Sequence, residues 1–332
     1  MKILLIGGTG TISGAITARL AAAGHEVWLV NRNRRAHLLP PGVKVLTADV
    51  ADESAIAALT AGAEYDCVAD FIAFVPEHLQ RDYRLFRGRA RQFVFISSAS
   101  AYAKPVESFP ITEATPLGNP FWEYSRNKQR CEEYLRSLPQ DGSFPVTIVR
   151  PSHTYCDRSA PVGVHGAKGS WQVLQRMLDG RPVVIHGDGT SLWTMTHSDD
   201  FAAGFCGLVG NPGALGETVN LTSDEARTWQ YIYEAIAAAL GVPLKPVYVA
   251  SAALAAAGPQ YDLRGSLLGD KANCTFFDNA KLKRLVPGFA AKVTMREGLS
   301  RAARYMAAHP ECQTPDPEFD AWCDRVIAAA GY

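Results

Sequence analysis

The chain has 332 residues, of which 47% are apolar, which is enough for a substantial core and argues against disorder. Lysine plus arginine equals aspartate plus glutamate, at 33 each, so the chain has no overall charge that would attract nucleic acid or an anionic membrane. These values predict a globular protein and argue against a nucleic-acid or membrane partner.

Cysteine usage and hydropathy bear on the cellular compartment and on whether the chain binds a metal. The seven cysteines are scattered and include no Cys-x-x-Cys pair, which argues against a disulfide framework and a zinc site. No apolar stretch is long enough to span a bilayer. A strand predicted from Lys2 leaves no room for a signal peptide. We therefore expect a soluble cytoplasmic protein that binds no metal.

Short apolar segments alternate with helical ones in the first half, which predicts a parallel sheet covered on both faces. The expected strands are Lys2–Ile6, Glu26–Val30, Val43–Thr47, Cys67–Phe71, Gln92–Ile96 and Val146–Arg150. The expected helices are Ile12–Ala23, Glu53–Ala61, Pro76–Arg87 and Tyr124–Ser137. The proline-rich, polar segment Ala103–Phe121 is interpreted as a long active-site loop.

The pattern is looser after Pro151. Helices are expected at Ser170–Leu178, Asp199–Val209 and Trp229–Leu240, and strands at Pro182–His186 and Thr218–Leu221. We interpret this half mainly as a lobe that binds the substrate, with some segments returning to the edge of the sheet.

A glycine-rich turn, GGTGTISG at residues 7–14, follows the first strand. Its glycines let the backbone approach a dinucleotide pyrophosphate, and the next helix offers its positive N-terminus to that phosphate. We predict that Gly7, Gly10, Thr11 and Ile12 contact a dinucleotide. Ser13 takes the place of a third glycine, which is a tolerable departure because serine is small. The alternative is a turn without a ligand.

Tyr124 and Lys128 place a phenol and an ammonium four residues apart on one helix face. A lysine beside a tyrosine lowers the pKa of the phenol, which suits Tyr124 to proton transfer at a substrate hydroxyl. The alternative is an accidental surface pair. Following the glycine-rich turn, this pair indicates redox chemistry with a nicotinamide cofactor.

The two motifs, in this order, resemble the extended short-chain dehydrogenase/reductase superfamily, in its NAD-dependent epimerase/dehydratase branch. The resemblance continues through Ala48–Val50, Phe95–Ser98, Val149–Pro151, Gly187–Thr190, His197–Asp200 and Phe277–Lys281. It implies an α/β fold: a Rossmann-type doubly wound parallel sheet over residues 1–165, and a smaller α/β lobe, mainly for substrate, over residues 166–332.

The resemblance also implies roles in catalysis. Ser98 would hydrogen-bond the reacting oxygen, Tyr124 would transfer the hydroxyl proton, and Lys128 would stabilise the tyrosinate and hold the nicotinamide ribose. Further cofactor contacts are implied at Asp49, Val50, Phe71, Ile72, Ala73, Pro151 and His153. Asp49 could instead belong to a helix cap, and His153 could instead be a packed structural residue.

The end of the second strand bears on the choice of cofactor. An NAD-selective site places Asp or Glu here to bind the ribose 2′-hydroxyl, but this chain has Asn31 and Arg32. Asn31 does not repel a 2′-phosphate, and Arg32 can pair with it bidentately. We therefore predict NADP in preference to NAD, with NAD as the alternative. Arg34 and Arg35 are interpreted as a solvated surface run.

The predicted substrate contacts are Ser98, Ser100, Tyr124, His153, Trp193 and Arg264. In the resembling nucleotide-sugar epimerases, an arginine that clamps the diphosphate stands where this chain has Trp193, and Arg264 is the nearest candidate for a second clamp. Indole has no charge and cannot replace a guanidinium. Trp193 is expected either to line the pocket or to pack the lobe core.

These departures leave several functions open. Ser98 is followed by Ala99 and Ser100 instead of the Asp-Glu pair of dehydratases, which disfavours elimination of water. We expect an oxidoreductase or epimerase acting on a secondary hydroxyl or ketone of a sugar-like substrate. The alternatives are an NADPH-dependent ketoreductase of a non-nucleotide substrate and an RNA-binding relative without enzymatic activity. A homodimer is a further open alternative.

Overall fold

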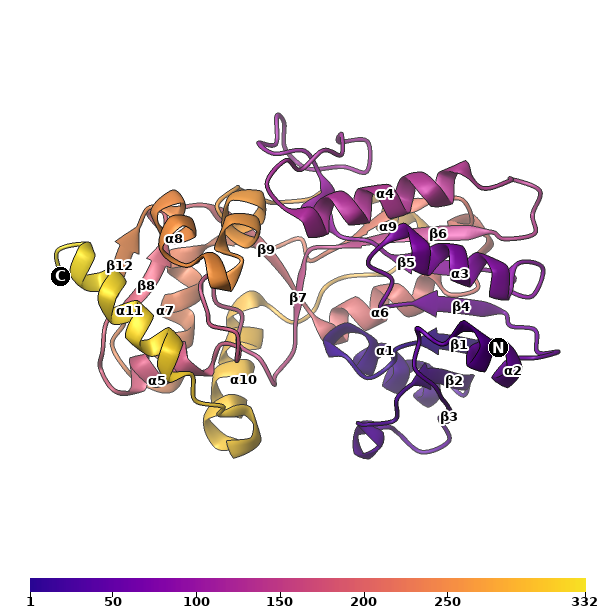
Figure 1. Cartoon of the computed structure of the whole chain (residues 1–332), viewed down its shortest axis with the longest axis horizontal. Helices are drawn as coiled ribbons and strands as arrows, with labels where there is room; N and C mark the ends of the chain where they lie inside the picture. Colours follow the sequence, from indigo (N-terminus) through magenta and orange to yellow (C-terminus); the bar gives the residue numbers. More distant parts are fainter.

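A seven-stranded parallel sheet, in the order β10-β6-β5-β4-β1-β2-β3, forms the centre of the larger of two lobes in the computed structural model, which describes residues 1–332 (Figure 1). Its strands are β1 (Lys2–Ile6), β2 (Glu26–Asn31), β3 (Lys44–Thr47), β4 (Cys67–Asp70), β5 (Phe93–Ile96), β6 (Val146–Pro151) and β10 (Thr218–Leu221). The predicted doubly wound α/β fold is therefore confirmed.

Helices cover both faces of this sheet. One face carries α1 (Thr11–Ala22), α6 (Ser198–Leu208) and α9 (Ala280–Leu285), and the other carries α2 (Glu53–Leu59), α3 (Pro76–Phe86) and α4 (Glu123–Ser137). Within β1, Ile3 and Leu5 pack under the first group of helices, while Leu4 and Ile6 pack under the second. A strand buried on both sides has no polar face, which explains its continuous apolar sequence.

The carboxyl ends of the central strands meet at one edge of the sheet. Ile6 pairs with Asp70, Asp70 with Phe95, and Ile96 with Val149. The strand order reverses between β1 and β4, and ligands of open α/β sheets bind at such a point.

The C-terminal lobe has its own core, made of 32 buried residues. Its helices are α5 (Trp171–Leu178), α7 (Trp229–Leu240), α8 (Ser251–Ala257), α10 (Met295–Ala308) and α11 (Pro317–Ala329). Its strands are β7 (His153–Tyr155), β8 (Val183–His186), β9 (Leu192–His197), β11 (Ala226–Thr228) and β12 (Pro246–Val249). The shorter turns are the 3₁₀ helices η1 (Ala36–Leu38), η2 (Ala99–Ala101), η3 (Pro212–Ala214), η4 (Pro259–Tyr261) and η6 (Pro310–Cys312), and the π-helix η5 (Arg264–Lys271).

The chain passes between the two halves several times. β10, α6 and α9 come from residues beyond 166 yet pack with the sheet, whereas β7 and β9 lie between the sheet and the lobe (Figure 1). His153 pairs with Met195 and begins β7, a strand that the sequence did not predict. A strand of three residues forms because it pairs with a neighbouring strand, so its own sequence is too short to predict it.

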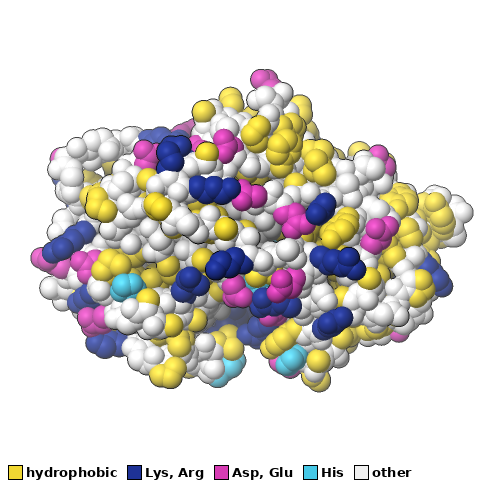
Figure 2. All heavy atoms as spheres, turned by 180° about the vertical axis from the view of Figure 1, so that it is seen from behind, with side chains coloured by type: hydrophobic (Ala, Val, Ile, Leu, Met, Phe, Trp, Pro, Cys, Tyr) yellow, Lys and Arg dark blue, Asp and Glu magenta, His cyan; other side chains and the backbone are white.

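Positive and negative side chains are interspersed over the face shown in Figure 2, in keeping with the balanced composition. None of the helices combines the length and the apolar character that crossing a membrane would require.

Candidate active site

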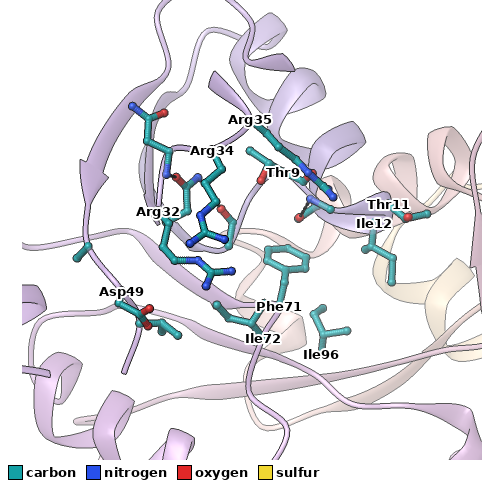
Figure 3. A pocket seen from close by; sticks show the side chains of 17 residues that line it. Thr9, Thr11, Ile12, Arg32, Arg34, Arg35, Asp49, Phe71, Ile72 and Ile96 are labelled. Atoms are coloured by element: carbon teal, nitrogen blue, oxygen red, sulfur yellow. Dashed lines mark hydrogen bonds between the residues drawn. The ribbon is translucent and has the colours of Figure 1, made fainter. Parts of the chain in front are cut away.

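A cavity of about 710 Å³ opens at the carboxyl ends of β1, β2 and β4 (Figure 3). Ten residues predicted to contact the cofactor line it: Gly7, Gly10, Thr11, Ile12, Asn31, Arg32, Asp49, Val50, Phe71 and Ile72. The other lining residues are Thr9, Ser13, Asn33, Arg34, Arg35, Ala48 and Ile96. The cavity is large enough for a drug-sized ligand.

The glycine-rich turn is shaped by backbone conformations that other residues rarely adopt. Gly7 has φ +109° and Gly8 has φ +87°, and a Cβ atom on Gly8 would lie 2.5 Å from the Leu29 side chain. The Gly10 amide donates to Ser13 Oγ over 3.0 Å, so the serine at the third glycine position helps to close the turn. The turn thereby directs the N-terminus of α1 at the cavity, where an anion is favoured.

Asn31 fastens the end of β2 to this turn. Its amide nitrogen donates to the Gly7 carbonyl over 3.0 Å, and its oxygen accepts from the Asn33 amide over 2.7 Å. No carboxylate is among the cavity residues at the end of β2, where NAD-selective sites place one.

Three arginines follow Asn31, and all three line the cavity. Arg32 and Arg34 lie above Phe71 and Ile72, while Arg35 extends toward the glycine turn (Figure 3) and donates to the Thr9 carbonyl over 3.2 Å. Arg34 and Arg35 are exposed, as a solvated run would be, and they also line the cavity. Asn33, which also lines the cavity, is left-handed, with φ +52°.

Asp49 is exposed at the opposite wall of the cavity, and its carboxylate accepts from the Ala51 amide over 3.0 Å. The residue that caps α2 is Asp52, whose carboxylate accepts from the Ala55 amide over 2.9 Å. Asp49 therefore does not serve as the helix cap and keeps an oxygen free for a ligand.

Lys128 is buried behind the cavity. Its ammonium donates to the carbonyls of Ala73 and Ile96 over 2.8 and 2.7 Å, and it lies 5.7 Å from the centre of the Tyr124 ring. Burial lowers the pKa of Lys128 to about 8. Ala73 is thus placed as a partner of Lys128 instead of lining the cavity.

Tyr124 is half-buried near Ser98. Burial raises the pKa of Tyr124 to about 12, and hydrogen bonding to Ser98 opposes the rise only in part. The expectation that Lys128 lowers the pKa of this phenol is wrong for this structure, because the Lys128 ammonium is engaged by two backbone carbonyls and burial dominates.

A chain of hydroxyls supports Ser98. Ser125 Oγ donates to Ser100 Oγ over 2.8 Å, and the hydroxyls of Ser100 and Ser98 lie 2.9 Å apart. Ser98 also accepts from the Ser100 amide over 3.2 Å, which fixes it at the start of η2. The sequence did not single out Ser125, although its place next to Tyr124 was a usable signal.

Among the predicted substrate residues of the lobe, Trp193 and His153 lie side by side, whereas Arg264 takes no part in this packing. Trp193 is buried, with its ring 5.3 Å from that of Trp229 and 6.5 Å from that of His153. Of the two roles considered for Trp193, packing in the core of the lobe is therefore the one that the structure favours. Arg264 is exposed at the start of η5. Burial lowers the pKa of His153 to about 3, so its imidazole is neutral. Pro151, also predicted to contact the cofactor, is buried at the end of β6.

Comparison with known proteins shows which family has this sequence and fold. The profile described as the NAD dependent epimerase/dehydratase family matches residues 3–222. The 2′-dehydrokanamycin reductase of Streptomyces kanamyceticus is 31% identical over 249 residues, which are 75% of this chain and 69% of that protein. The chloroplast stem-loop binding protein of 41 kDa b from Arabidopsis thaliana is 25% identical, over 73% of this chain and 64% of that protein.

Among solved structures, a UDP-glucuronic acid 4-epimerase from Bacillus cereus, in complex with UDP-glucuronic acid and NAD, superposes with a TM-score of 0.74 and 18% identity. The superposition covers 93% of this chain and 99% of that one. The chain therefore belongs to the NAD-dependent epimerase/dehydratase family of the extended short-chain dehydrogenase/reductase superfamily. It is an enzyme of this family.

Proposed function

We propose that the protein is an NADP(H)-preferring ketoreductase, which reduces a ketone on a sugar-like substrate that carries no nucleotide diphosphate. The observation that carries the proposal is the clamp position: Trp193 is buried and uncharged where a diphosphate would need a guanidinium, and Arg264 is exposed. The resemblance to the 2′-dehydrokanamycin reductase of Streptomyces kanamyceticus supports a reductase.

The cavity at the switch point fits a dinucleotide, because it is lined by Gly7 and Gly10 of the glycine turn and by the N-terminus of α1, where a phosphate is favoured. Gly7, Gly10 and Thr11 would hold the pyrophosphate, and Arg32, with Arg34 beside it, would hold the 2′-phosphate. The bound cofactor supplies the hydride. Asp49 and Val50 would face the adenine, and Phe71 and Ile72 would form the floor of the pocket.

Side chains of the protein would supply the proton that the reduced carbonyl oxygen takes up. Tyr124, whose pKa is raised to about 12 by burial, holds its proton at neutral pH and can donate it to the carbonyl oxygen as charge develops there. Ser98, fixed by Ser100 and Ser125, would donate a second hydrogen bond to the same oxygen. Lys128 would keep a positive charge beneath the phenol.

The test is whether NADPH is consumed. Purified protein is mixed with NADPH and polyhydroxylated cyclic ketones, and the absorbance of NADPH is followed. Stoichiometric oxidation of NADPH with formation of the alcohol is expected. An epimerase is the second candidate, because the solved neighbour carries that activity. Its signature is a tightly retained nicotinamide that stays through turnover, without net oxidation of NADPH.

A role in binding RNA is the third candidate, suggested by the name of the Arabidopsis relative. Interspersed charges on the face in Figure 2 give no basic stripe for it there. A gel-shift titration with a stem-loop RNA distinguishes this role, because an RNA-binding function should survive Tyr124→Phe whereas turnover should not.

A further inference from the structure

Trp122 stands at the N-cap of α4, two residues before Tyr124. This position usually holds Ser, Thr, Asp or Asn, whose side chains accept from the free amides of the first turn, or else Gly. The side chain of Trp122 makes no cap hydrogen bond. Tryptophan therefore does not stabilise the start of the helix in the usual way, and its contacts lie elsewhere.

The indole of Trp122 is held by the turn that leads into the π-helix η5. Its Nε1 donates to Asp262 Oδ2 over 2.7 Å. Asp262 is left-handed, with φ +51°, and among the residues other than glycine only Asn33 shares this conformation. Backbone strain of this kind persists where the surrounding structure imposes it, and it clusters at functional sites. A Cβ atom on Gly265 would overlap the indole, so the close approach of η5 requires glycine there.

η5 belongs to the lobe, because its Leu267 is part of the buried core of the lobe. π-Helices are rare and are often found at functional sites. Asn119 adds a second contact with η5, since its amide donates to the carbonyls of Gly269 and Ser100, over 2.5 and 2.7 Å. The lobe is thus fastened to the start of α4 through Asn119 and Trp122.

Trp122 also contacts the ring of Tyr124. The two ring centres lie 4.9 Å apart, with 46° between the planes, which is within the range of aromatic pairs. Tyr124 is the second residue of α4, and helix ends fray unless contacts hold them. Its other aromatic neighbour, Phe74, has its ring centre 6.3 Å away and is 44% exposed. Trp122 is therefore the neighbour that can fix the Tyr124 ring, because the lobe fixes Trp122.

We propose that Trp122 is a positioning residue, which holds the ring of Tyr124 in the orientation for proton transfer, and that Asp262 holds Trp122 for this purpose. The lobe then sets the place of a proton donor that the sheet's own helix carries. A misplacement of about 1 Å can cost 10²-fold in rate, so the contact has a measurable effect. This inference rests on the proposed role of Tyr124 as the proton donor and adds the residues that orient it.

Two substitutions at Asp262 separate the role of its side chain from that of its backbone. Asp262→Gly removes the acceptor but tolerates the left-handed conformation, so the turn is kept. Asp262→Asn also tolerates this conformation and retains an oxygen that accepts from the indole. Trp122→Ala removes the ring. Trp28→Phe is the matched control, because the Trp28 indole also donates to a carboxylate, that of Glu26, and does not line the cofactor cavity.

The place of the phenol can be followed without turnover. In protein labelled with fluorotyrosine, the fluorine resonance of Tyr124 is assigned by its loss in Tyr124→Phe. It should shift or broaden in Asp262→Gly, where the indole is present but no longer held. It should keep its wild-type position in Asp262→Asn and Trp28→Phe. An unchanged resonance in Asp262→Gly overturns the inference, independently of any activity.

Steady-state kinetics with NADPH and pentahydroxycyclohexanone measure the effect on the reaction. Trp122→Ala should lower kcat roughly 10- to 100-fold, with the KM for the ketone and the affinity for NADPH nearly unchanged. Asp262→Gly should lower kcat roughly 2- to 10-fold, the net value of one hydrogen bond, and Asp262→Asn should restore it. In the Tyr124→Phe background, Trp122→Ala should add little, because no phenol remains to be positioned.

A fall in kcat that is equally large with and without the Tyr124 phenol, or a loss confined to KM, overturns the inference and gives Trp122 a structural or substrate-binding role. Melting temperatures monitor folding, and Asp262→Gly replaces Trp122→Ala in this comparison if the latter does not fold. A wild type that oxidises no NADPH, or a Tyr124→Phe variant that retains turnover, overturns the proposed function instead. The fluorine resonance then decides by itself whether Trp122 holds the ring.

Discussion

Glu132 of α4 and Arg150 of β6 form a bidentate ion pair, which joins the helix that carries Tyr124 and Lys128 to the sheet. Arg150 Nε and Nη2 donate to the two oxygens of Glu132 over 2.9 and 2.6 Å, with both side chains almost fully buried. Ser97 donates to Glu132 over 2.5 Å. Because Glu132 lies one turn beyond Lys128, this pair fastens α4 to the two strands whose ends bear Ser98 and Pro151.

Removing the charge of Glu132 should therefore destabilise the fold. Glu132→Gln leaves a buried guanidinium unpaired, and the expected loss in the free energy of unfolding is about 3–5 kcal/mol. Chemical denaturation measures it. The neighbouring Glu133→Gln, at an exposed position, is the control and should change little. An unaffected Glu132→Gln would mean that the pair has no net role in stability.

The same pair predicts a pH dependence. Burial raises the pKa of Glu132, but the hydrogen bonds and charge of Arg150 outweigh it, and the net shift is downward. A carboxyl with a lowered folded-state pKa contributes stability above its unfolded pKa and loses it as the pH falls through the folded value. Wild type should thus lose stability in acid below the ordinary glutamate pKa, and Glu132→Gln should show a smaller loss. Melting curves across the acid range compare them.

Tyr124→Phe deletes the transferable proton and keeps the ring. Turnover should fall by about 10²–10⁴-fold, the usual contribution of general acid catalysis, while NADPH affinity changes little. Steady-state kinetics and a fluorescence titration measure the two effects. Tyr134→Phe, on the same helix, is the control. Near wild-type turnover in Tyr124→Phe would show that another group supplies the proton.

Lys128 should set the alkaline limb of the reductive pH profile. Its pKa is lowered to about 8 by burial, whereas the pKa of Tyr124, raised to about 12, keeps the phenol protonated throughout. Reduction by wild type should therefore decline above about pH 8 as the ammonium is lost. Lys128→Arg retains its charge and should move the decline to higher pH, whatever its absolute rate. An identical decline in both proteins would assign it to another group.

Arg32→Ala tests the choice of cofactor. NADPH affinity should fall roughly 10- to 100-fold because a charged hydrogen bond to the 2′-phosphate is lost, while NADH affinity should hardly change. Titration of both cofactors against both proteins measures this, with the exposed Arg91→Ala as control. Equal affinity of wild type for the two cofactors would remove the basis of the prediction.

UDP-glucose should not bind saturably in the micromolar range, because Trp193 provides no charge at the clamp position. Calorimetric titration of the NADPH-bound protein is the direct measurement. Tight binding that Arg264→Ala abolishes would show that Arg264 replaces the clamp, and a nucleotide-sugar substrate would then be favoured.

Local sequence was sufficient for the sheet, and less so for the lobe. The strands of the first half begin and end within one residue of expectation, because each is a short apolar run closed by turn residues. β7 and η5 went unpredicted, since a three-residue strand and a π-helix depend on their partners and not on periodicity. The left-handed conformation of Asn33, next to Arg34 and Arg35 at the cavity, is another feature that the sequence does not reveal.

The repeated passage of the chain between sheet and lobe has a consequence for modularity. Phe71, in the floor of the cofactor pocket, packs against Phe205 of α6 at a ring distance of 5.5 Å. A fragment that ends at residue 165 would lack this support and would leave β6 as a bare edge where β10 belongs. Exchanging lobes between relatives by a single fusion point should consequently yield aggregates, and a workable chimera has to keep α6, β10 and α9 with the sheet that they complete.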